Sequence, residues 1–276
     1  MSEDWLLAVD LGSIAMVGVG LLFVVVWAVD RHRWCALFFA GAIAAYVAAT
    51  LALSVPIDVA LASSIHGILF PVAMVLLADG LCRRVGDRLP PVMTIGSVVV
   101  MAVVVWYFAY VSPLMVARIV TQNLGTAILL ATVLRELWMR PVKTGPDRIA
   151  LVVAAALAVS TGVDVVVALF SSVPREITTP AELDNYLASY LEMCLIVASA
   201  VVLPAGMVAL LGVTVVDVVQ ELRFDRDRDE LTGVLNRRGF SRRAEAKLGC
   251  NRELWCGRRG FGLLQDGQRR IGTRRW

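Results

Sequence analysis

The chain has 276 residues, of which 58% are hydrophobic, and its mean hydropathy is +0.74. Because soluble domains are about 45–50% apolar, this composition excludes a water-soluble globular fold for most of the chain. The formal net charge of +3 is small, so the placement of the charges is more informative than their sum.

Seven apolar segments approach about 20 residues, the length of helix that crosses the roughly 30 Å hydrocarbon core of a bilayer. They cover residues 7–29, 34–53, 59–81, 92–111, 113–134, 149–170 and 188–215. We predict that residues 1–215 form an all-α polytopic membrane domain of about seven transmembrane helices, with the lipid bilayer as partner. Acidic residues precede the first segment, where a signal peptide would carry Lys or Arg, so we expect this segment to be retained.

Basic residues are concentrated in alternate links between these segments. The links after the first, third and fifth segments hold Arg31 and Arg33, then Arg83, Arg84 and Arg88, then Arg135, Arg140, Lys143 and Arg148. The links at 54–58 and 112–113 hold no basic residue, and the link at 171–187 holds one against three acidic residues. Because basic loops stay cytoplasmic, we expect a multi-pass protein of the cell membrane with its N-terminus outside and its C-terminus in the cytoplasm.

Ionisable and polar residues inside the predicted spans are costly in lipid and often functional. His66, Arg118, Asp164 and Glu192 all fall in the outer halves of their spans, and Gln122 lies one helical turn from Arg118. One interpretation is an outward-facing pocket for a small polar ligand. The other is structural: Arg118 pairs with Asp164 or Glu192, and His66 hydrogen-bonds locally. The sequence leaves both open.

Two functional classes find little support in the sequence. The five cysteines are scattered, Cys250 and Cys256 are too far apart for a CxxC pair, and no His lies near them, so we predict no metal site. No pair of broken-helix repeats is present, which disfavours a transporter.

The composition changes after residue 215. Val215, Val219 and Leu222 are spaced four and three residues apart, as on one face of a helix. Residues 216–228 are therefore predicted to be a helical signalling linker. Either the last membrane helix frays into a charged stretch, or this linker is a dimeric stalk. We expect a homodimer formed through the membrane domain or the linker.

Residues 229–240 read Asp-Glu-Leu-Thr-Gly-Val-Leu-Asn-Arg-Arg-Gly-Phe. Thr232 and Gly233 break the chain, and Asn236 could cap a following helix. This segment resembles the opening of GGDEF domains, with the pattern D-x-L-T-G-[LV]-x-N-R-[RK]-x-F. The matching residues are Asp229, Leu231, Thr232, Gly233, Val234, Asn236, Arg237, Arg238 and Phe240.

The resemblance implies a membrane-bound diguanylate cyclase, which condenses two GTP molecules to cyclic di-GMP at the interface of two α/β domains. Residues 229–248 would be the N-terminal fragment of such a domain, and in that family these motif residues are structural. The family's metal-binding D-[LIV]-D-x-F-K, its guanine-binding N-D-x-x-G-H-x-x-G-D and its GGDEF turn are missing from residues 249–276. Mg²⁺ is expected for the intact family domain, but for this chain we expect no catalytic residue, no cofactor and no cyclase activity.

Residues 249–276 are rich in Arg and Gly and show no apolar periodicity. A basic tail for acidic lipid headgroups or for nucleic acid is one interpretation. We favour an out-of-frame tail, and so expect no nucleic-acid partner. Read from the second nucleotide of each codon, residues 260–276 can encode D-L-D-C-F-K-T-V-N-D-A-L-G-H-A-G-G, the missing family stretch in order. The family's next residue, Asp, gives a stop codon after Trp276, so we expect a one-nucleotide frame slip between about Arg243 and Trp255.

Three functions follow from the sequence. The first is a membrane signalling protein that resembles a diguanylate cyclase, with an output domain that is truncated and inactive in this chain. The second is a stand-alone membrane sensing or binding module that detects a small molecule on the outer side. The third and least favoured is a transporter.

Overall fold

The structure is a computed structural model. It describes residues 3–54, 58–140, 144–170, 181–182, 190–228, 234, 236–237 and 239–241, and within these ranges it leaves the side chains at 3–11, 54, 190–200 and 225 undescribed. The chain divides into two compact units, Met1–Asp217 and Val218–Trp276.

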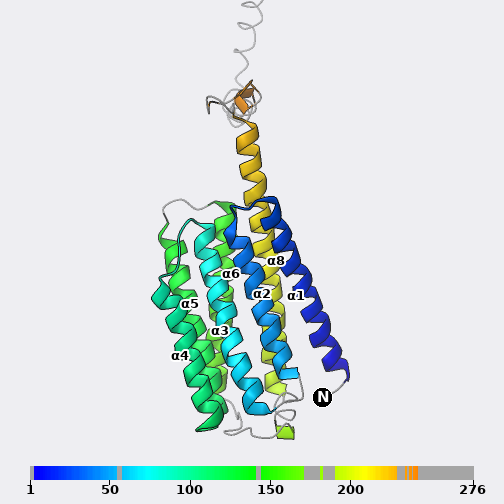
Figure 1. Cartoon of the computed structure of the whole chain (residues 1–276), viewed down its shortest axis with the longest axis vertical. Helices are drawn as coiled ribbons and strands as arrows, with labels where there is room; N and C mark the ends of the chain where they lie inside the picture. The colour runs from blue at the N-terminus through cyan, green and yellow to red at the C-terminus, as the bar shows by residue number, and fades with distance from the viewer. Residues whose placement is uncertain are drawn as a thin grey trace, which may run out of the picture. The chain divides into compact units, whose positions relative to one another are not determined.

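Seven long helices dominate the described part of the chain (Figure 1). They are α1 (Glu3–Val29), α2 (Trp34–Ser54), α3 (Val59–Arg84), α4 (Pro91–Tyr110), α5 (Met115–Met139), α6 (Gly145–Phe170) and α8 (Tyr190–Arg226). Among the described residues, each of the seven contains a stretch long and apolar enough to cross a bilayer. The prediction of seven long apolar helices is therefore confirmed, as a multi-pass membrane protein requires, although the last candidate span covers Val201–Phe224 rather than residues 188–215.

Helix α8 is longer than a membrane span requires. Its 37 residues extend about 56 Å at 1.5 Å per residue, against a hydrocarbon core of about 30 Å. The helix continues beyond residue 215, the predicted end of the last span, and includes residues 216–226. Val215, Val219 and Leu222 are exposed along it.

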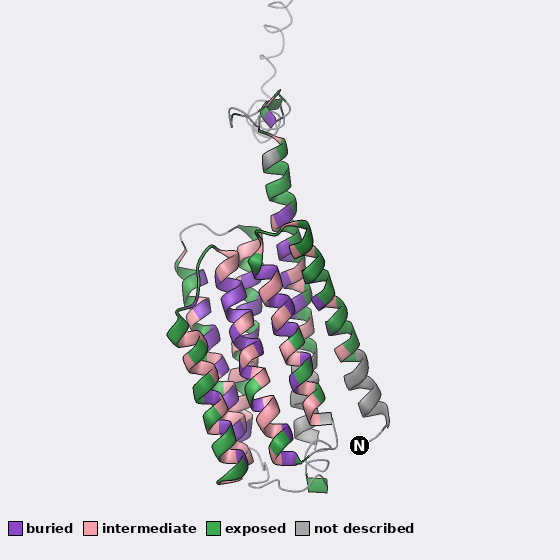
Figure 2. Cartoon of the chain, viewed as in Figure 1, coloured by how far each residue is buried: buried purple, intermediate pink, exposed green. Residues whose placement is uncertain are grey.

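The helix bundle exposes many large apolar side chains. Figure 2 shows that exposed positions recur along successive helices. Ile14, Val92, Val152 and Phe170 are all more than 60% exposed. Soluble monomers rarely expose contiguous apolar surface on this scale, whereas lipid-facing helices require it. Burial thus agrees with hydropathy in placing the bundle in a bilayer.

Aromatic side chains lie near both ends of the bundle. At one end, where the α1–α2, α3–α4 and α5–α6 loops lie, the Trp27 and Trp34 rings pack 6.3 Å apart and the Arg31 guanidinium lies 4.1 Å from the Trp27 ring. At the opposite end the Trp106 and Tyr110 rings lie 6.1 Å apart. Trp and Tyr favour the interface between hydrocarbon and water, so they mark the two membrane surfaces. The first end carries the basic loops and is called the basic-loop end below.

Local sequence signals explain where several helices begin. Asp58 Oδ1 accepts a hydrogen bond from Leu61 N at 3.0 Å and so caps α3. Pro91 stands in the first turn of α4, where its missing N–H costs nothing. Thr144 and Asp147 form a reciprocal cap before α6, with Thr144 N donating to Asp147 Oδ2 at 2.8 Å and Asp147 N donating to Thr144 Oγ1 at 3.3 Å.

Helix α3 is the centre of the packing, because it contacts α2, α4 and α5. Two glycines on α3 allow the close approach. A Cβ atom at Gly80 would lie 2.7 Å from Phe39 Cε1 of α2, and one at Gly67 would overlap the Val105 side chain of α4. Small residues at helix contacts are the usual means of close packing in lipid, where no hydrophobic force drives helices together.

Candidate functional site

A polar cluster lies between α3 and α5 at the end of the bundle opposite the basic loops. Arg118 is only 4% exposed, although it stands in the first turn of α5. Its Nη1 donates a hydrogen bond to Ser63 Oγ at 2.8 Å. Its Nε is buried and has no hydrogen-bond partner among the residues that the structure describes. No salt bridge joins Arg118 to a carboxylate in that part of the chain.

A second polar pair lies one turn further along the same two helices. Gln122 Nε2 lies 3.3 Å from His66 Nδ1, and the His66 ring stacks on Phe70 with centroids 5.4 Å apart. Thr126 is fully buried one more turn along α5, and its Oγ1 has no partner among the described residues. Arg118, Gln122 and Thr126 therefore form a polar stripe on α5, which the α3 side chains meet.

Three of the five candidate residues from the sequence, His66, Arg118 and Gln122, thus lie in this cluster. Asp164 is half-buried near the end of α6 and has an interaction partner of its own. The side chain of Glu192 lies outside the described residues. The described contacts include no ion pair between Arg118 and Asp164, which was one of the expected pairings. The described partner of Arg118 is a neutral hydroxyl.

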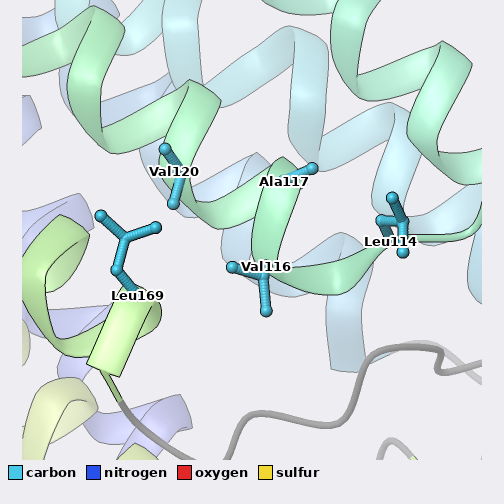
Figure 3. Close-up of a pocket in the computed structure, with 5 residues that line it drawn as sticks. All are labelled: Leu114, Val116, Ala117, Val120 and Leu169. Atoms are coloured by element: carbon cyan, nitrogen blue, oxygen red, sulfur yellow. The ribbon is translucent and has the colours of Figure 1, made fainter.

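An apolar hollow of about 440 Å³ lies beside the start of α5 (Figure 3). The described residues that line it are all aliphatic: Leu114, Val116, Ala117, Val120 and Leu169. Because these five residues offer no polar side chain, their surface suits a hydrocarbon chain better than a polar ligand.

The basic-loop end holds a different buried arginine. Arg84, at the end of α3, has a side chain that is 4% exposed. Its Nε and Nη2 donate to the two carboxylate oxygens of Asp217 on α8 at 2.7 and 3.2 Å, and its Nη1 donates to Asp147 Oδ1 on α6 at 2.9 Å. This arginine joins three helices through two carboxylates, one of them bidentate.

Asp79, one turn before Arg83, completes this end of α3. Its carboxylate accepts hydrogen bonds from Arg83 Nε at 2.7 Å and from Leu89 N at 3.0 Å. The second bond fixes the end of the α3–α4 loop against the helix. Asp79 is therefore a structural residue of the loop.

In the second unit, Asn236 connects the end of α8 with the start of a helical turn. Its Oδ1 accepts a hydrogen bond from Gly239 N at 2.9 Å, the N-cap geometry expected for this residue. Its Nδ2 donates to Arg226 O at 2.7 Å and to Arg228 O at 3.3 Å. A Cβ atom at Gly239 would overlap the Asp227 carbonyl oxygen, so only glycine fits there.

Other predicted residues of this unit lie outside the described part of the chain. They are Asp229, Leu231, Thr232, Gly233 and Arg238, together with residues 242–276. Arg237 and Phe240 are described and exposed. Among the described residues, no group of three His, Cys, Asp or Glu side chains could hold a metal ion.

Sequence reasoning missed Ser63, Asp147 and Asp217. Arg84 was counted only as a loop charge for orientation. A small hydroxyl residue carries no signal in a span, and partners separated by 55, 63 and 133 positions cannot be found from spacing. Asp217, placed directly after a long apolar run, was the one available hint.

Comparison with protein-family models, with curated proteins and with solved structures gave no match.

Proposed function

We propose that this chain is the membrane-embedded sensing part of a signalling protein of the diguanylate cyclase type, whose GGDEF domain begins at Asp229. The observation that carries the proposal is the twelve-residue motif at 229–240, which begins three positions after α8 ends at Arg226. The Asn236 contacts support it, because they join the helix end directly to the first turn of the motif's helix.

The proposed orientation places the N-terminus outside and the C-terminus in the cytoplasm of the cell membrane, where GTP is present. Its support is the basic residues of three alternate loops. The test is labelling with a membrane-impermeant maleimide in intact cells, on a background whose five native cysteines are replaced by alanine. Val111→Cys, in the α4–α5 turn, should react, and Asp87→Cys, in the α3–α4 loop, should react only after lysis. The reverse pattern would overturn the orientation.

Signalling in this proposal proceeds through a homodimer along α8. The exposed apolar stripe Val215, Val219 and Leu222 supports such a contact. Leu222→Cys, on that cysteine-free background, should form a disulfide-linked dimer on mild oxidation. Glu221→Cys, one position round the helix, is the matched control and should cross-link more slowly. Equal rates at the two positions would contradict a stalk packed through this stripe.

Enzymatic output is proposed for the frame-restored gene only, since residues 241–276 contain none of the family's metal-binding carboxylate motifs. The experiment compares cyclic di-GMP in cells that express this chain with cells that express a version shifted by one nucleotide between residues 243 and 255. Synthesis should occur only in the second. A repaired gene that makes none, or DNA without GGDEF-type coding in the alternative frame, would refute the proposal.

A further inference from the structure

Arg118 resembles Arg84 in being a buried arginine. Its side chain has one described hydrogen-bond partner, whereas the Arg84 side chain has two. In both residues Nη1 is engaged, by Asp147 in Arg84 and by Ser63 in Arg118. In Arg84 the Nε edge binds Asp217 in a bidentate manner, whereas in Arg118 the same edge has a buried Nε with no partner among the described residues. A planar oxyanion is the group that fits this edge.

Electrostatics favours an anion at this position. An arginine side chain keeps its charge at any physiological pH, so Arg118 cannot relieve its burial by losing a proton. A buried charge without a counter-ion costs several kcal/mol in a protein interior and more in lipid. Its described partner, the Ser63 hydroxyl, supplies a dipole but no negative charge.

The position of Arg118 on α5 makes an anion more favourable still. The helix begins at Met115, so Arg118 lies in the first turn, where the backbone N–H groups create a partial positive charge. This turn directly follows the short loop at 111–114, close to the membrane surface marked by Trp106 and Tyr110. An anion that enters from the aqueous side would therefore cross little of the membrane to reach the guanidinium.

The geometry points to Arg118 as the anchor of a binding site for a small organic carboxylate, with Ser63 orienting the guanidinium. The polar pair His66 and Gln122, one turn deeper, would face a ligand's second polar group. The site belongs to the membrane domain, so it does not depend on the GGDEF resemblance and survives if that proposal fails.

The test is thermal unfolding of the full chain in phosphatidylcholine nanodiscs, followed by the fluorescence of its seven tryptophans. Sodium acetate is the probe, and sodium chloride at equal ionic strength is the control. Acetate should raise the Tm saturably and chloride should not. Arg118→Met should abolish the acetate effect. Arg118→Lys, which keeps the charge but loses the planar fork, should raise the acetate midpoint at least tenfold.

Two further variants keep the test decisive. Arg135→Met removes an exposed arginine from the same helix and should leave the acetate effect unchanged. Glu192→Gln tests whether that carboxylate, whose side chain is not described, already neutralises Arg118. An acetate effect that appears only in Glu192→Gln, that persists in Arg118→Met, or that is absent from the unaltered chain would overturn the inference.

Discussion

Each end of the membrane domain has a buried arginine side chain, and the two arginines differ in the charge of their described partners. At the basic-loop end, Arg84 binds two carboxylates from two other helices. At the opposite end, Arg118 is also buried but has a serine hydroxyl as its described partner. Both residues stand on long apolar helices, so their surroundings do not explain the difference.

The difference separates a structural arginine from a binding one. A charge that is fully compensated by its own chain contributes to holding helices together, and removing it leaves two uncompensated carboxylates. A charge that is incompletely compensated makes the unliganded protein less stable and favours a ligand of opposite sign. Burial of an arginine therefore does not by itself determine its function.

The largest effect is expected at Arg84. Arg84→Met should lower the free energy of unfolding by about 3 kcal/mol, because the partly buried carboxylates of Asp147 and Asp217 remain without their cation. Reversible unfolding in mixed micelles measures this. The double variant Arg84→Met, Asp217→Leu should lose less than the sum of the two single variants, and strict additivity would show that the contact contributes nothing.

Close packing of α3 should be similar at both ends, so looser packing cannot be the origin of the contrast. Gly67→Ala and Gly80→Ala should each cost about 2 kcal/mol, since the new methyl group meets the stiff Val105 or Phe39 side chain. Gly96→Ala, which meets nothing within 4 Å, is the control and should be neutral or stabilising. A large loss of unfolding free energy in Gly80→Ala alone would show that α3 is packed less closely at the Gly67 end.

The single neutral partner of Arg118 should contribute less than a carboxylate does. Ser63→Ala should cost about 1.5 kcal/mol of unfolding free energy, the usual range for a hydrogen bond to a charged group. Ser64→Ala is a matched control, because Ser64 Oγ only donates to Ala60 O of its own helix at 2.8 Å. If the two variants behave alike, Ser63 does not hold Arg118.

A smaller effect is expected in the second unit, where the neutral side chain of Asn236 caps a helical turn. Asn236→Ala should destabilise the turn that follows α8 by about 1 kcal/mol, as loss of an N-cap does. Asn236→Asp keeps the cap acceptor but loses the donors to Arg226 O and Arg228 O. Hydrogen exchange at the Gly239 amide should rise in the first variant and stay low in the second. Equal rates in both variants would show that the Asn236 side chain does not protect this amide.

The membrane domain could be predicted from sequence to a large extent, and its charge partners could not. Runs of apolar residues gave all seven spans, because crossing lipid requires them. Helical spacing placed Gln122 beside Arg118, and span order placed His66 at the same end. Which faces of α3, α5, α6 and α8 meet depends on rotation and packing, so Ser63, Asp147 and Asp217 became visible only in the structure.

The most direct test of the contrast is to compare Arg84→Met with Arg118→Met in the same nanodiscs without added anion. Arg118→Met removes one hydrogen bond together with the cost of an uncompensated charge, so its unfolding free energy should change by less than about 1 kcal/mol. Arg84→Met should lose several times more. Equal losses at the two positions would contradict the account, because Arg118 would then be as fully paired within this chain as Arg84 is.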